Sequence, residues 1–335
     1  MVIPTRITLG PVYYLWSEDK WRDFYLRVAD EAPVGRVVIG ETVCSKRAHF
    51  HDAILPDVVD RLQAGGKEIV LSTLALVTLD REVKATAALA RQDVYPVELN
   101  DLSGLSLAEH PHMIGPLVNV YNAATARLLF GRGARTICLP PELPLASIKA
   151  LCAELPDRDF EIFAFGRLPL AISARCAHAR AKGHSKDNCQ FVCGEDPDGL
   201  ALRTLDDQSF LALNGVQTVS QTCQALLQEL GELQGQGIRG IRLSPQDCDM
   251  VVVADLFRRV LDGEMEPDGA LERLRQVLSG HGVLERLPSR TRGGALGAAA
   301  EGDLIAPRQA CRRLTAHAGL SATDSRDAHL LSREG

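Results

Sequence analysis

The chain has 335 residues and a formal charge of −6, with 46% hydrophobic and 24% charged residues. This composition is typical of a globular protein with one large domain or two smaller ones, and the acidic balance argues against nucleic-acid binding through overall basicity. The sequence has no apolar run of about 18 residues and no secretory signal at its N-terminus, so we expect a cytoplasmic protein without a transmembrane segment.

Short apolar, β-branched segments alternate with helical patterns along most of the chain. Strands are predicted at residues 7–12, 36–40, 68–74, 95–100, 113–120, 135–139, 160–166 and 238–243. Helices are predicted near residues 21–32, 56–64, 82–91, 123–130, 144–155 and 250–261, with a short helical stretch near Ser106. This alternation predicts an α/β fold, and the number of units favours a (β/α)8-type barrel, which could be incomplete or distorted, over an open doubly wound sheet.

The alternation stops after the seventh predicted strand. Residues 168–203 hold three cysteines, two histidines and many charges, and a long irregular insertion of this kind in an α/β domain is usually functional. A strand-like pattern then covers residues 208–219 and a helical pattern residues 222–233. Because residues 281–335 are rich in Ala, Gly and Arg, we expect a barrel-like domain over residues 1–280 and a poorly ordered tail after it.

The insertion contains a cluster of cysteines. The sequence has nine cysteines, and reducing conditions in the cytoplasm favour metal binding, catalysis or burial for them over disulfide formation. Cys176, Cys189 and Cys193 fall within 18 residues, separated by twelve and then by three residues. Thiolates are ligands of iron–sulfur clusters and of zinc, and the Arg, Lys and His residues nearby would offset their charge and favour deprotonation.

Barrel geometry favours Cys44 as a fourth ligand. Cys44 follows the second predicted strand, and the loops after the strands of such a barrel share the face that carries the chemistry. Cys248, in a loop after the last predicted strand, is the rival. The remaining cysteines fit less well, because three lie in predicted strands or apolar helical patterns and one lies in the tail: Cys138, Cys152, Cys223 and Cys311.

The spacing of the cysteines does not distinguish an iron–sulfur cluster from a zinc site. Structural zinc usually gathers its ligands as paired short-spaced units, and only Cys189 and Cys193 form such a pair here. His178 and His184 could supply nitrogen ligands to zinc. The pattern also lacks the Cys-x3-Cys-x2-Cys triplet that leaves one iron of a cluster open, which favours electron transfer or a structural role over Lewis-acid catalysis.

Three segments of the chain resemble one known family. They are Gly-Glu-Thr-Val-Cys44-Ser-Lys-Arg, Gly166-Arg-Leu-Pro-Leu-Ala-Ile-Ser-Ala-Arg-Cys176 and Lys186-Asp-Asn-Cys189-Gln-Phe-Val-Cys193. Over roughly residues 5–280 the sequence is similar to the collagenase-like peptidase family of unassigned catalytic type, and within it to members that act in anaerobic ubiquinone biosynthesis.

The resemblance implies a barrel-like α/β fold and a [4Fe–4S] cluster held by Cys44, Cys176, Cys189 and Cys193. It further implies a heterodimer with a related family member that takes part in oxygen-independent hydroxylation of the ubiquinone ring. A small aromatic quinone precursor and prephenate, as oxygen donor, would be its ligands, and a lipid-carrier protein its accessory partner. It assigns no catalytic residue.

The sequence is also compatible with other functions. One is hydroxylation of RNA by a protein of the same family, and another is a zinc-bound structural or interaction module. Peptidase activity is disfavoured because the sequence lacks both His-Glu-x-x-His and Gly-x-Ser-x-Gly. Polar residues near the predicted strand ends are candidates for binding an anionic aromatic acid: Glu41, Arg47, Asn119, Asn122 and Arg167.

Overall fold

Eight parallel strands form a closed barrel. The computed structural model of the chain describes residues 5–278 and 283–284. The barrel strands are β1 (Arg6–Leu9), β2 (Arg36–Ile39), β3 (Glu68–Ser72), β4 (Val97–Leu99), β5 (His112–Ile114), β6 (Ala134–Leu139), β7 (Asp159–Ile172) and β11 (Gly240–Leu243). Each pairs in parallel with the next, and β11 closes the ring by pairing with both β7 and β1. The predicted (β/α)8-type barrel is therefore confirmed, and it is complete.

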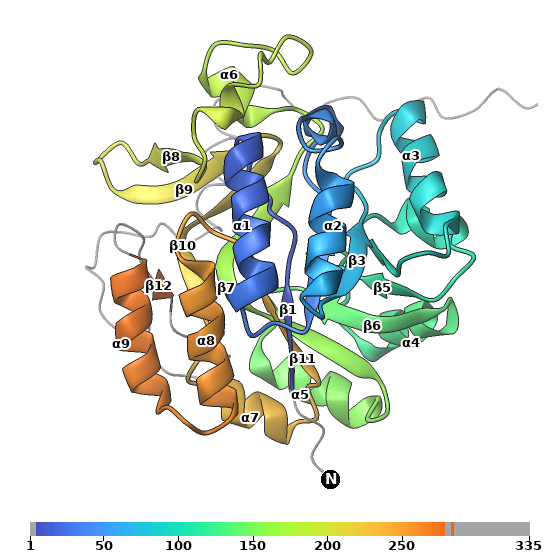
Figure 1. Cartoon of the computed structure of the whole chain (residues 1–335), viewed down its shortest axis with the longest axis vertical. Helices are drawn as coiled ribbons and strands as arrows, with labels where there is room; N and C mark the ends of the chain where they lie inside the picture. The colour runs from blue at the N-terminus through green and yellow to red at the C-terminus, as the bar shows by residue number, and fades with distance from the viewer. Residues whose placement is uncertain (1–4, 279–282, 285–335) are drawn as a thin grey trace, which may run out of the picture. The chain divides into compact units, whose positions relative to one another are not determined.

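Helices cover the outside of the barrel (Figure 1). They are α1 (Glu18–Glu31), α2 (Leu55–Ala64), α3 (Asp80–Arg91), α4 (Ala123–Gly131), α5 (Leu145–Glu154), α7 (Leu230–Gly235), α8 (Met250–Leu261) and α9 (Pro267–Val277). In α8, Asp249 caps the first turn, and Val253, Leu256 and Phe257 are buried against the strands. Within the described ranges, none of the helices combines the length and the apolar character needed to cross a bilayer.

The seventh strand runs beyond the barrel into an antiparallel arm. Past Phe165, β7 pairs with β10 (Gln217–Ala225), which pairs with β9 (Ser209–Asn214), which pairs with β8 (Leu200–Arg203). β12 (Val283–Leu284) also pairs with β10. Figure 1 shows the arm at the end of the barrel where the parallel strands finish, next to the short helix α6 (Ala177–Ala181).

Three local predictions differ from the structure. The helix expected over residues 222–233 is wrong at its start, because Cys223–Ala225 pair with β7 and helix begins only at α7. The strand expected over residues 208–219 is two strands, joined by a turn at Gly215. The fifth strand ends at Ile114, since Gly115 and Pro116 follow and proline cannot donate a ladder hydrogen bond.

The interior of the barrel holds a buried ion pair. The Arg242 guanidinium donates to Glu98 Oε2 at 2.5 Å and to Glu161 Oε1 at 2.7 Å, and Thr8 Oγ1 donates to Glu161 Oε2 at 2.5 Å. Burial raises the pKa of Glu161, but the charges of nearby arginines outweigh burial and lower it to about 2. Glu161 is therefore ionised in the folded barrel, and Arg242 compensates two buried carboxylates.

The predictions for the tail lie outside the described residues, apart from β12. The expected poor order of residues 281–335, and the expected domain boundary near residue 280, therefore stay predictions.

Candidate functional site

The four cysteines predicted as ligands line one small cavity, which we call the cysteine cavity. Cys44 precedes the 3-10 helix η1 (Ser45–Phe50) after β2, and Cys176 caps the N-terminus of α6. Cys189 and Cys193 come from the loop after α6 and from the 3-10 helix η3 (Val192–Gly194). Residues more than 130 positions apart in the sequence thus meet beyond the carboxyl end of the barrel, as the geometry argument predicts.

The other described cysteines lie elsewhere. Cys248, the rival for the fourth position, packs against the barrel core with its Sγ 3.7 Å from Met250 Sδ. Cys138, Cys152 and Cys223 are buried in β6, α5 and β10. Among the described residues, Cys44 and not Cys248 therefore shares a cavity with the clustered three. Whether the four thiols bind a metal centre stays a prediction.

His178 holds α6 against the antiparallel arm. Its Nδ1 lies 3.1 Å from the Leu213 carbonyl oxygen and its Nε2 lies 3.0 Å from Asp196 Oδ2. Burial lowers the pKa of His178 by more than Asp196 raises it. Because both ring nitrogens are engaged, His178 is positioned to orient Cys176 and not to serve as the nitrogen ligand that a zinc site would use. Neither His178 nor His184 lines the cysteine cavity.

The backbone between Cys189 and Cys193 is left-handed at two consecutive residues. Gln190 has φ 47° and Phe191 has φ 55°, a conformation that non-glycine residues rarely adopt. This turn starts η3 and brings both thiols to the same cavity. Such strain persists where the surrounding structure requires it, and it is common at functional sites.

Arg47 places a buried positive charge beside the thiols. Its Nη1 donates to the Tyr13 carbonyl oxygen at 2.8 Å and its Nη2 donates to Asn214 Oδ1 at 3.0 Å. Its Nε is buried and has no hydrogen-bond partner among the described residues. Burial lowers the pKa of the guanidinium, but Glu41 and the cysteines Cys193 and Cys44 outweigh burial and raise it. The cavity is thus arranged to accept negative charge.

The surroundings alone do not activate the thiols of Cys44 and Cys193. Burial raises the pKa of Cys44 and of Cys193 above the ordinary value, and the charge of Arg47 opposes this only in part. The nearby basic residues thus act in the expected direction, toward the deprotonated ligand, but burial outweighs them at both positions. A bound cation would be needed to displace the protons, as is general for thiolate sites.

The spacing of the thiols bears on the kind of centre. Within residues 5–278 and 283–284, no three His, Cys, Asp or Glu side chains are grouped closely enough to hold a metal ion. In a four-iron cluster each cysteine binds a different iron, so its ligands stand farther apart than around one zinc ion. The space between the thiols is about 20 Å³.

Gly215 allows Arg47 to approach the cavity. Gly215 has φ +62°, and a Cβ at this position would lie 2.4 Å from Arg47 Nη2. We expect Gly215→Ala to lower the free energy of unfolding by more than about 2 kcal/mol, from backbone strain plus displacement of the buried guanidinium. Gly66→Ala is the matched control, because Gly66 has φ +76° and no atom within 4 Å. Urea unfolding of both metal-free variants tests this, and equal losses would show that the contact with Arg47 is unimportant.

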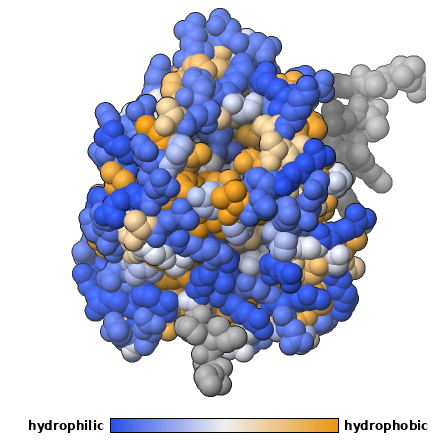
Figure 2. Space-filling view, turned by 45° about the vertical axis from the view of Figure 1, so that its right-hand side comes forward, coloured by the Kyte–Doolittle hydropathy of each residue, from blue (hydrophilic) through white to orange (hydrophobic). Residues whose placement is uncertain are grey.

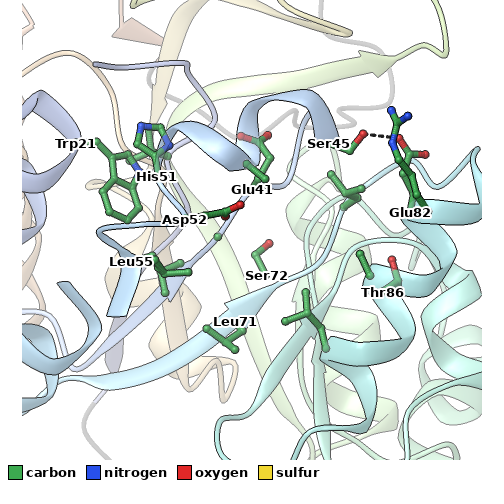
Figure 3. Close-up of a pocket in the computed structure, with 18 of the residues that line it drawn as sticks. Trp21, Glu41, Ser45, His51, Asp52, Leu55, Leu71, Ser72, Glu82 and Thr86 are labelled. Carbon is green, nitrogen blue, oxygen red and sulfur yellow. Dashed lines mark hydrogen bonds between the residues drawn. The ribbon is translucent and has the colours of Figure 1, made fainter. Parts of the chain in front are cut away.

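A larger cavity lies beside the cysteine cavity and was not foreseen from the sequence. It has a volume of about 350 Å³ and lies outside β2 and β3, between η1, α2 and α3, so we call it the β2–β3 cavity (Figure 3). A third cavity of about 330 Å³ shares Ser45 and Glu82 with the β2–β3 cavity and Cys44 and Lys186 with the cysteine cavity. Cys44 therefore lines both the cysteine cavity and the third cavity.

Three of the polar residues proposed to bind an anionic acid have other roles. Arg167 pairs with Asp198 at 2.6 Å, and Asn122 caps α4 by accepting from Thr125 N. Arg47 is held by Tyr13 and Asn214, as described above. Only Glu41 of the five candidates lines the β2–β3 cavity.

Two comparisons with known proteins bear on the chain, and the one with protein families agrees with the resemblance noted in the sequence. In a comparison of structures, the chain is similar to N-acetylneuraminate lyase from Fusobacterium nucleatum, with 8% identity and a TM-score of 0.43 over 81% of this chain and 78% of that chain. The sequence profile of the family described as peptidase family U32 matches residues 18–279, which include the whole barrel after β1 and all four clustered cysteines. The chain therefore belongs to peptidase family U32.

Proposed function

We propose that this chain is an iron–sulfur protein of the UbiV type that takes part in oxygen-independent hydroxylation of the ubiquinone ring. The observation that carries the proposal is the meeting of Cys44, Cys176, Cys189 and Cys193 at one cavity beside the buried guanidinium of Arg47. Four thiolates and a buried cation match the ligand chemistry and the negative charge of a [4Fe–4S] cluster. Such a cluster, when bound, would supply one-electron transfer.

The residues of the chain would hold this centre and shield it. Ala179 N donates to Cys176 Sγ at 3.4 Å, a contact of the kind that adjusts the potential of an iron–sulfur centre. Tyr13, Val43 and Val216 pack with three of the cysteines into a small apolar cluster that is separate from the barrel core: Cys44, Cys176 and Cys189. This cluster would limit the access of water to the sulfur atoms.

The proposal includes a partner. In the expected function the chain forms a heterodimer with a related UbiU-like member of the same family, with a lipid-carrier protein as accessory partner and prephenate as the oxygen donor. This part rests on the resemblance of the three cysteine segments described above.

A peptidase function, suggested by the family's name, is less well supported. The histidine that lines the β2–β3 cavity, His51, directs its Nε2 to the Trp16 carbonyl oxygen at 3.1 Å. Its ring stacks on Trp21. His51 is therefore not poised to activate a serine or cysteine nucleophile in that cavity.

Anaerobic purification followed by metal analysis tests the proposal. We expect about four irons and about four acid-labile sulfides per chain, a brown colour and little zinc. Mixed with its family partner, the loaded chain should hydroxylate a phenolic quinone precursor without oxygen, and RNA from the same reaction should stay unmodified. A colourless protein that contains zinc, or one without metal, would overturn the iron–sulfur assignment. Modified RNA would instead favour the alternative hydroxylation.

A further inference from the structure

The β2–β3 cavity is built as a binding site for a small molecule. Its volume of about 350 Å³ lies in the range of ligand pockets, and it sits at the carboxyl ends of β1, β2 and β3, where barrel enzymes of this type bind their ligands. The space-filling view shows hydrophobic residues gathered near the centre of the face turned forward, between hydrophilic ones (Figure 2). Nothing in the family assignment accounts for this cavity.

Most of the cavity wall is apolar. The aliphatic side chains come from β1 and its loop, β2, β3 and helices α2 and α3: Val12, Ile39, Leu55, Leu71, Leu74 and Leu89. The Trp21 ring forms one side, stacked on His51 at 4.7 Å between ring centroids with an interplanar angle of 15°. A flat aromatic molecule with an apolar substituent would bury its surface well in such a wall.

Most of the charged groups of the cavity are carboxylates. Glu41 lies in the upper wall, between His51 and Asp52 on one side and Ser45 and Glu82 on the other (Figure 3). Glu82 accepts from Ser45 Oγ at 2.5 Å and from Thr78 N at 2.8 Å, so it is held as the anion. Three carboxylates against the single guanidinium of Arg81 disfavour an anionic ligand and favour one that donates hydrogen bonds.

Glu41 links the cavity to the loop that carries Cys44 through hydrogen bonds. Glu41 Oε1 accepts from Cys44 N at 2.8 Å and from Val43 N at 2.7 Å. One carboxylate thus orders the loop that carries Cys44 on one side and lines the β2–β3 cavity on the other. A molecule bound there would lie one short loop away from the cysteine cavity.

We propose that the β2–β3 cavity binds a neutral, largely apolar phenol, with its hydroxyl directed to the carboxylates and its ring against Trp21, and that it discriminates against aromatic carboxylates. The inference rests on the proposed function only where it identifies this phenol with the ring that is hydroxylated. The binding itself follows from the shape and charge of the cavity.

Calorimetric titration of the anaerobically purified full chain with 4-hexylphenol and 4-hexylbenzoate tests the proposal. These probes share the ring and the alkyl chain and differ in charge. We expect the phenol to bind at least about tenfold more tightly, because the benzoate would be buried near three carboxylates. Equal binding of both probes, tighter binding of the benzoate, or no binding of the phenol would overturn the inference.

Substitutions in and near the cavity test whether the probes bind there. Ala85 on α3 lines the cavity and is exposed, so Ala85→Phe should fill the cavity without disturbing the core and weaken phenol binding at least about tenfold. Ala88→Phe, on the same helix and also exposed but outside the cavity lining, is the control and should bind normally. Asp52→Asn should strengthen benzoate binding several-fold relative to phenol binding, because it removes one of the three carboxylates of the cavity. Unchanged phenol binding in Ala85→Phe would place the probe elsewhere.

Iron and sulfide analysis of the same samples separates the two proposals. Ala85→Phe should keep its metal content and its thermal unfolding midpoint, because the side chain does not touch the cysteine cavity. A protein that holds iron and fails to bind the phenol overturns the cavity assignment alone. A protein that binds the phenol and holds no iron overturns the proposed function alone.

Discussion

Replacing Cys193 or Cys44 by alanine is expected to reduce bound iron from about four atoms to fewer than one per chain. Both residues line the cysteine cavity, and Cys193 is buried within it. A cluster that loses one of four thiolate ligands exposes an iron to water and is readily lost. Iron and sulfide analysis of anaerobically purified variants, together with absorbance near 400 nm, measures the change.

Cys248→Ala is the matched control for these variants. Cys248 is half-buried, like Cys44, and it was the rival candidate for the fourth position, but it packs against the barrel core. The Cys248→Ala protein should keep its full iron content and its colour. If Cys248→Ala bleaches the protein and Cys44→Ala leaves it brown, the fourth ligand is misassigned.

The Arg242→Met variant is expected to lose about 3–5 kcal/mol of its free energy of unfolding. Arg242 lies in the barrel interior with 1% of its side chain exposed, and it pairs with both Glu98 and Glu161. Removing the guanidinium leaves both buried carboxylates without their direct ion-pair partner. Urea unfolding followed by circular dichroism at neutral pH measures this loss.

Two further variants separate the charge effect from the change in side-chain size. Arg127→Met breaks an exposed pair with Glu154, in which more than half of each side chain is accessible, and should cost less than about 1 kcal/mol. Adding Glu98→Gln and Glu161→Gln to Arg242→Met removes the uncompensated charges and should restore part of the stability. A loss below about 1 kcal/mol for Arg242→Met would mean that the interior carboxylates find other compensation.

Local patterns along the chain were sufficient to predict the barrel. Most strand segments, such as residues 36–40, are short and apolar, and most are followed by a helical pattern, so the alternation alone indicates parallel pairing. The closeness of Cys44 to the cysteine-rich insertion followed from the same regularity, because loops after parallel barrel strands lie on one face.

Features that depend on contacts between distant segments were not predictable in this way. Residues 223–225 suit a helix or a strand by composition, and pairing with β7 about 60 positions earlier makes them a strand. The role of His178 depends on Leu213 and Asp196, and the position of the Arg47 guanidinium depends on its contacts with Tyr13 and Asn214. Periodicity reports which face of an element is apolar and does not report which polar atoms meet across the fold.

The cavities show the same difference between features set by local sequence and features set by contacts between distant segments. The sequence was enough to place chemistry-bearing cysteines and a barrel scaffold, because ligand type and strand–helix alternation are local properties. The β2–β3 cavity is lined by segments spread over residues 12–89, and its shape and excess of carboxylates exist only once those segments pack. Burial and long-range packing set the shape of a cavity and the pKa of the groups around it, and neither quantity is carried by any short stretch of the chain.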